Sequence, residues 1–87
     1  MNELPNVIIY TTRFCPFCVR AKSLLNKKSV HFTEIRVDGD AALRREMMAK
    51  AGSTSVPQIW IDETHVGGCD ELYAAERSGR LNQWLSQ

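Results

Sequence analysis

The sequence predicts an α/β domain in which helices flank a mixed four-stranded sheet. Its 87 residues suit one domain, and we expect that single domain to span residues 1–87. Short β-branched and aromatic runs alternate with stretches of helical periodicity, which gives the order β-α-β-α-β-β-α-α. A strand–helix–strand opening implies a right-handed crossover and a parallel pair. A hairpin later in the chain adds antiparallel strands, so the sheet must be mixed.

The first half of the chain supplies two strands and two helices. The run VIIY is β-branched and aromatic, as strands usually are. Asp38-Gly39-Asp40 is a turn and capping signal, and Gly52 marks a helix end. The expected elements are a strand at Val7–Tyr10, a helix from Pro16 to about Lys28, a strand at His31–Val37 and a helix at about Ala41–Ala51.

The second half supplies the hairpin and two further helices. Asp62-Glu63-Thr64 turns one apolar run into another, which is typical of a hairpin. Gly67-Gly68 ends the strand pattern, and Ser78-Gly79 interrupts the helix that follows. The expected elements are strands at Val56–Ile61 and His65–Gly67, a helix that begins near Cys69, and a last short helix at Leu81–Leu85.

Composition excludes several classes of partner. The formal net charge is +1, which gives no electrostatic reason to expect nucleic acid or a charged membrane surface as a partner. The opening residues MNELPNVIIY contain an acidic residue, a proline and an apolar run too short for a secretory signal or a spanning segment. We therefore expect a cytoplasmic protein that binds neither nucleic acid nor membrane.

The stretch RFCPFCVRAK holds two of the three cysteines. The cytosol keeps thiols reduced, and an odd count excludes a fully paired structural framework within the chain. A zinc site usually takes four ligands, yet only Cys69, His31 and His65 could join the pair, so no metal is expected. A Cys-X-X-Cys beside a strand–helix–strand pattern instead indicates a thioredoxin-like redox motif.

The position of the pair predicts a different role for each cysteine. Cys15 stands where a helix should start, and Pro16 falls at the first helical position. Free N–H groups and the helix dipole favour a thiolate there, where a pKa of about 8.5 can fall to about 3.5–7.5. Arg13 and Lys22 can add to this effect. Cys18 lies one turn deeper and faces the core, so Cys15 is expected to be the exposed attacking thiolate and Cys18 the sheltered resolving thiol.

Three segments together resemble the glutaredoxins, specifically the small dithiol kind with a Cys-Pro-aromatic-Cys site. They are YTTRFCPFCVRAKSLL, TSVPQIWID and GGCDEL, and the likeness extends from Val7 to about Leu81. The resemblance implies a trimmed thioredoxin fold, a four-stranded mixed sheet flanked by helices. It also implies reduction of glutathione mixed disulfides and protein disulfides with glutathione as co-substrate, through Cys15 and Cys18.

The resemblance implies where glutathione binds. Arg13 falls where relatives usually have lysine, and its cation suits the glycine carboxylate. Phe17 stands where most relatives have tyrosine; the ring can still pack, but the hydroxyl is lost. Ser55-Val56-Pro57 resembles a loop whose proline is cis, which lets the Val56 backbone pair with the ligand. Several relatives have a basic residue where this chain has Ser53, so one contact is absent.

The start of the last long helix completes the implied site. The backbone N–H groups of Cys69 and Asp70 suit the γ-glutamyl carboxylate, and the Asp70 carboxylate suits the ammonium group. Asp70 could equally be a first-turn helix stabiliser, and Gly67-Gly68 only a tight turn. Two roles are considered for Cys69: a passive small residue and a regulatory thiol.

The resemblance also leaves rival functions. A thioredoxin-reductase-dependent hydrogen donor would share the fold, but Arg13 and the Cys69-Asp70 helix start favour glutathione. Some glutaredoxins carry an iron–sulfur cluster between two subunits, which the proline after Cys15 disfavours. The expected partners are glutathione and glutathionylated or disulfide-containing proteins, and the expected state is a monomer.

Overall fold

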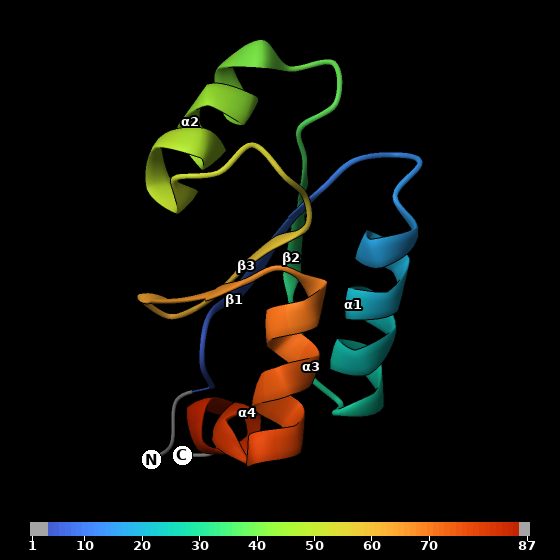
Figure 1. Cartoon of the computed structure of the whole chain (residues 1–87), viewed down its shortest axis with the longest axis vertical. Coiled ribbons are helices and arrows are strands. Elements are labelled where there is room, and N and C mark those ends of the chain that lie inside the picture. Colours follow the sequence, from blue (N-terminus) through green and yellow to red (C-terminus); the bar gives the residue numbers. More distant parts are fainter. Residues whose placement is uncertain (1–3, 86–87) are drawn as a thin grey trace.

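The computed structural model describes residues 4–85 and contains a four-stranded sheet flanked by helices (Figure 1). The predicted order of the eight elements is confirmed. They are β1 (Val7–Thr11), α1 (Pro16–Lys27), β2 (Thr33–Arg36), α2 (Ala41–Ala51), β3 (Gln58–Ile61), β4 (Thr64–Gly67), α3 (Cys69–Ser78) and α4 (Arg80–Leu85). Within this described part, no helix is long and apolar enough to cross a membrane.

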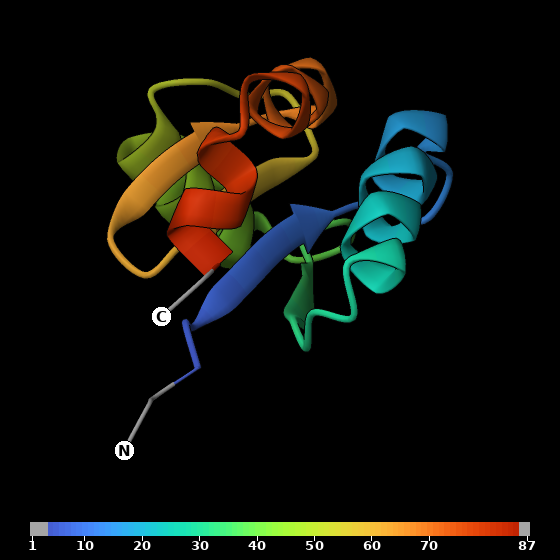
Figure 2. The same cartoon turned by 90° about the horizontal axis from the view of Figure 1, so that it is seen from below.

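The sheet is mixed, as predicted, with the strand order β2-β1-β3-β4. β1 and β2 pair in parallel, with Ile9 opposite Glu34. β1 and β3 pair antiparallel, with Ile9 opposite Ile59, and β3 and β4 form the expected antiparallel hairpin. A loop leads from the end of β1 to the first turn of α1 (Figure 2), so residues 12–15 lie at one end of a central strand.

Apolar residues alternate between the two faces of the sheet, which fixes the layers. Val7 and Ile9 face one core with α1, α3 and α4, whereas Ile8 and Tyr10 face a second core with α2. β3 alternates in the same way, with Trp60 on the α2 side. Figure 1 shows α2 apart from α1, α3 and α4. This alternation follows from the two-residue repeat of a strand that is buried on both faces.

Two predicted strands are shorter in the structure. The predicted strand from Val56 begins at Gln58, because the Val56–Pro57 bond is cis and proline has no N–H for the ladder. The predicted strand His31–Val37 is shorter at both ends, since β2 begins at Thr33 and ends at Arg36. Helix ends differ by one residue: α1 ends at Lys27 and α4 begins at Arg80.

The predicted ends of α2 are confirmed. The Asp40 side chain accepts a hydrogen bond from the Leu43 N–H at 3.1 Å, which satisfies one free donor of the first turn. Gly52 follows the last turn with a φ of 69°, a left-handed conformation that glycine adopts without steric cost.

Candidate active site at the start of helix α1

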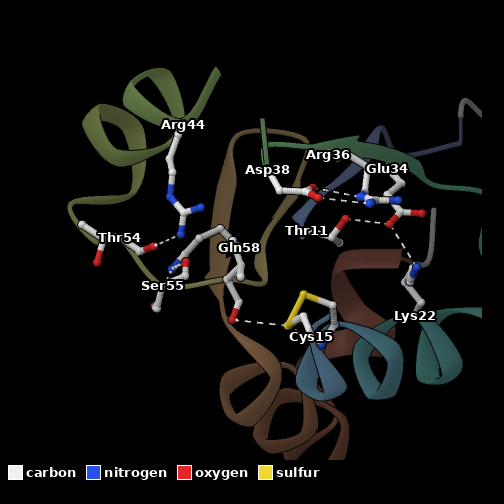
Figure 3. Close-up of a disulfide and its surroundings, with 12 residues drawn as sticks. Thr11, Cys15, Lys22, Glu34, Arg36, Asp38, Arg44, Thr54, Ser55 and Gln58 are labelled. Atoms are coloured by element: carbon white, nitrogen blue, oxygen red, sulfur yellow. Dashed lines mark hydrogen bonds and ion pairs between the residues drawn. A yellow bond between two sulfur atoms is a disulfide. The ribbon is translucent and has the colours of Figure 1, made fainter. Parts of the chain in front are cut away.

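Cys15 caps the N-terminus of α1 and forms a disulfide with Cys18 (Figure 3). Cys15 Sγ accepts a hydrogen bond from the Cys18 N–H at 3.1 Å, and the Cys15 carbonyl accepts from the Val19 N–H at 3.1 Å. Pro16 occupies the first helical position, as predicted. A backbone donor and the positive end of the helix dipole therefore converge on one sulfur, which stabilises negative charge there.

Cys15 is more exposed than Cys18, as predicted, but the difference is small. Cys18 is 1% exposed and Cys15 is 9% exposed. The expectation that Cys15 is freely exposed is therefore wrong for this disulfide form. Its Sγ is turned toward the Cys18 backbone, and the Val56 carbonyl oxygen lies 3.9 Å from it on the other side.

Lys22 does not serve the thiolate as predicted, because its ammonium pairs with Glu34. Lys22 Nζ donates to Glu34 Oε2 at 3.0 Å, and the Thr11 hydroxyl donates to the same oxygen at 2.6 Å. Thr11 is fully buried at the end of β1. These contacts, the Thr11 hydrogen bond first, hold the pKa of Glu34 below its usual value of 4.5. The cluster ties β1, β2 and α1 together (Figure 3).

The cluster makes part of the stability depend on pH. The folded-state pKa of Glu34 is lowered, so ionised Glu34 stabilises the folded protein. This contribution to the free energy of unfolding is complete above the usual pKa of 4.5, and it is lost as the pH falls through the lower folded-state pKa. We expect Glu34→Gln to lower the free energy of unfolding by about 1 kcal/mol at pH 7, and by less at about pH 3. Urea unfolding at several pH values measures this. Glu63→Gln, an exposed carboxylate in the β3–β4 turn, is the matched control; an equal loss at every pH would contradict the assignment.

Asp38 pairs with Arg36 just after β2. The Asp38 carboxylate accepts two hydrogen bonds from the Arg36 guanidinium, at 3.1 and 3.2 Å. These bonds lower the pKa of Asp38. The Arg13 side chain remains exposed, and its Cζ lies 5.8 Å from the centre of the Phe14 ring.

An open pocket lies beside the cysteines and brings together most of the predicted ligand-binding residues. Its lining consists of Phe17, Ser55, Val56, Pro57, Gly68, Cys69, Asp70 and Glu71. Arg13 is not among these residues, so the pocket and the predicted carboxylate contact are separate features. The pocket adds Gly68 and Glu71, which were not predicted as site residues.

The loop before β3 supplies one wall of the pocket. The Val56–Pro57 peptide bond is cis, as the resemblance implied. The Val56 carbonyl oxygen lies 3.9 Å from Cys15 Sγ, so the backbone of this loop does face the active-site sulfur (Figure 3). Pro57 itself is buried, which makes the wall rigid.

The opposite wall is the start of α3, and glycine brings it close. Glu71 Oε1 accepts a hydrogen bond from the Gly68 N–H at 2.8 Å, which caps the helix. A Cβ on Gly68 would lie 3.3 Å from the Pro57 carbonyl oxygen. The glycine therefore lets the chain's own Pro57 backbone approach, which brings the two walls together. The glutamate three residues after the cap was the sequence signal for this contact.

Gln58 joins the pocket loop to the hairpin. This buried amide donates through Nε2 to the Ser55 carbonyl at 3.0 Å, and its Oε1 lies 2.7 Å from His65 Nε2. Since the Ser55 carbonyl can only accept, Oε1 must accept from a protonated His65 Nε2. Ser53 Oγ in turn accepts from the Ser55 N–H at 3.2 Å. A polar residue in the run VPQIWI was the available signal, because a buried amide needs partners.

Cys69 is a buried free thiol at the first position of α3. Burial raises its pKa, and the neighbouring Asp70 and Glu71 carboxylates add to this effect while Arg20 opposes it. A thiol that is both covered and protonated reacts slowly. These observations favour the passive reading of Cys69. Among residues 4–85, no group of three or more His, Cys, Asp or Glu side chains is arranged to hold a metal ion.

The chain is similar to known glutaredoxins in both sequence and fold. The glutaredoxin family model matches residues 7–66. The chain is 61% identical to a glutaredoxin of Pseudomonas aeruginosa, over 95% of this chain and 99% of the relative. It is similar to the solution structure of a glutaredoxin from Brucella melitensis, with a TM-score of 0.86 and 46% identity over 97% and 91% of the two chains. A crystal structure of a buckwheat glutaredoxin–glutathione complex matches with a TM-score of 0.86 and 25% identity over 94% and 77%.

Proposed function

The chain belongs to the glutaredoxin family, and from this premise we propose that it reduces glutathione mixed disulfides and protein disulfides with glutathione as co-substrate. Its family and its Cys15–Cys18 dithiol make it a thiol–disulfide oxidoreductase. One observation carries the glutathione dependence: six of the residues expected to bind glutathione line one pocket beside Cys15. The buckwheat relative was crystallised with glutathione, which supports the proposal.

The pocket offers each part of glutathione a partner. The Val56 backbone, which faces Cys15 Sγ, suits the cysteinyl backbone of the tripeptide. The first turn of α3 presents N–H groups at Cys69 and Asp70 to the γ-glutamyl carboxylate, and the exposed Asp70 carboxylate suits the ammonium group. The Phe17 ring packs against the ligand, and the exposed Arg13 guanidinium suits the glycine carboxylate.

Two routes of exchange follow from two thiols. In the first, the Cys15 thiolate attacks the glutathione sulfur of a mixed disulfide, the substrate leaves as a thiol, and a second glutathione then releases oxidised glutathione. In the second, Cys15 attacks a protein disulfide, and Cys18 resolves the mixed disulfide. The resulting Cys15–Cys18 disulfide is the state the structure contains, and two glutathione molecules reduce it.

A coupled assay tests the proposal. The oxidised protein and a mixed disulfide of glutathione with 2-mercaptoethanol are supplied either with glutathione, glutathione reductase and NADPH, or with thioredoxin reductase and NADPH. We expect NADPH consumption in the first mixture only. Turnover with thioredoxin reductase alone would instead support the hydrogen-donor function.

Gln58 is expected to position the pocket loop without touching the reacting sulfurs. Gln58→Leu leaves the Ser55 carbonyl and the His65 N–H without their partner. We expect KM for the glutathione mixed disulfide to rise about fivefold with kcat within about twofold of wild type, and the free energy of unfolding to fall by about 1–3 kcal/mol. Steady-state kinetics and urea unfolding measure both. The control is Gln83→Leu, an exposed glutamine on α4; a fall in kcat with an unchanged KM would refute the positioning role.

We also propose a single-domain, monomeric protein that acts in the cytoplasm, where thiols are kept reduced and a dithiol enzyme can cycle. Cluster transfer is the rival binding function. Anaerobic reconstitution with iron, sulfide and glutathione tests it by absorbance in the visible range. We expect a colourless protein, because Pro16 rigidly starts the helix directly after Cys15.

A further inference from the structure

Exposed apolar side chains are concentrated in the short segment of sequence around Cys15. Within residues 4–85, the large apolar side chains that are well exposed are Leu4, Phe14, Phe17, Val19 and Met48. Three of these five lie within four residues of Cys15: Phe14 at 89% exposed, Val19 at 61% and Phe17 at 53%. Single exposed apolar residues are ordinary, but a group of them around a reactive sulfur marks an interaction site.

Phe17 lines the pocket proposed for glutathione, whereas Phe14 does not. Phe14 is the residue directly before Cys15, and its ring is almost fully in solvent, with the Arg13 guanidinium 5.8 Å from its centre. A contact with a cation constrains the ring but leaves most of its surface free.

We propose that Phe14 is a docking residue for polypeptide disulfides that carry an apolar side chain next to the target cysteine. The proposal rests on the proposed reduction of protein disulfides and names a preferred substrate class. Its basis is the covalent intermediate. In a disulfide the two Cα atoms lie about 4.4–6.8 Å apart, and successive Cα atoms about 3.8 Å apart. A side chain that flanks the substrate cysteine can therefore reach the residue that flanks Cys15.

The chemistry fixes when this contact forms. The Cys15 thiolate attacks one sulfur of the substrate disulfide; a Cys15–substrate disulfide forms, and the other substrate sulfur leaves as a thiolate that takes up a proton. The Cys18 thiolate then attacks Cys15 Sγ, the second substrate thiolate leaves, and the two electrons come from the Cys15–Cys18 dithiol. An apolar neighbour that covers the Phe14 ring removes apolar surface from water during the first step.

Single-turnover kinetics test the proposal without glutathione. Two eight-residue peptides with one cysteine each, flanked by leucines in one and serines in the other, are oxidised to symmetrical disulfides. Excess reduced protein is mixed with each, and release of peptide thiol is followed by mass spectrometry after acid quench. We expect wild type to react about fivefold faster with the leucine peptide, and Phe14→Ser to reduce this ratio to about one. Phe14→Leu should retain most of the ratio, because leucine restores an apolar surface.

Leu4→Ser is the matched control, since Leu4 is 76% exposed and lines a different pocket with Lys28 and Leu85. It should keep the wild-type ratio. An unchanged ratio in Phe14→Ser, or a wild-type ratio of one, would overturn the docking role. The proposed use of glutathione is tested separately by the coupled assay. If that assay fails, the single-turnover ratio can still be measured, because the single-turnover experiment contains no glutathione.

Discussion

Cys15→Ser is expected to abolish thiol–disulfide exchange, with turnover of any disulfide substrate at least about 10³-fold below wild type. The structure gives the reason. The positive end of α1 and the Cys18 N–H converge on Cys15 Sγ, so this sulfur is the one whose thiolate is stabilised. A serine hydroxyl stays protonated at neutral pH and does not attack sulfur. Cys18 is fully buried and cannot take over as the first nucleophile.

Alkylation measures the same asymmetry directly. Reduced wild type treated briefly with iodoacetamide should gain one carbamidomethyl group, at Cys15, because the Cys18 N–H and the start of α1 stabilise its thiolate. Cys18 and Cys69 are more deeply buried, at 1% and 4% exposed against 9% for Cys15. Cys15→Ser should gain none on that timescale, and the urea-unfolded wild type should gain three. Full activity in Cys15→Ser, or first labelling at Cys69, would overturn the assignment of roles.

The fold could be predicted from the sequence because the helix-capping and turn signals agree with the pattern of apolar residues along the chain. β1 and β3 alternate between two cores, and the capping signals at Asp40 and Gly52 coincide with the real ends of α2. One strand boundary was wrong for a local reason. Val56 looks like a strand residue, but Pro57 has no N–H for the ladder, so β3 begins at Gln58 and the Val56 carbonyl oxygen lies 3.9 Å from Cys15 Sγ.

Predictions about single charges were weaker than predictions about backbone positions. Lys22 is near Cys15 in sequence, yet its ammonium binds Glu34 on a strand that a sequence reading cannot place to within one residue. Gln58 and Glu71 are a different case, since each binds a backbone group only three residues away, the Ser55 carbonyl and the Gly68 N–H, and the sequence carried a signal for both. The residues that line the pocket came instead from a resemblance, and three separate segments do converge there.

Cys18→Ser is expected to separate the two routes of exchange. The Cα atoms of Cys15 and Cys18 are 5.1 Å apart, so Cys18 resolves a Cys15–substrate disulfide within one molecule. Such a reaction outcompetes millimolar glutathione, and its loss should slow turnover of a peptide disulfide about 100-fold. Turnover of a glutathione mixed disulfide needs only Cys15 and should stay within about threefold of wild type, because glutathione itself is the second nucleophile.

The intermediate provides the sharper measurement. With a peptide disulfide as substrate, Cys18→Ser should accumulate one covalently bound peptide per protein, visible by mass spectrometry and removed by dithiothreitol, while wild type should show none at steady state. Cys18→Ala is the companion variant, and it should behave alike if only the thiol matters. A Cys18→Ser protein that turns over the peptide disulfide at the wild-type rate, with no trapped species, would show that glutathione resolves every mixed disulfide. The buried sulfur would then serve the packing of α1 against the core rather than catalysis.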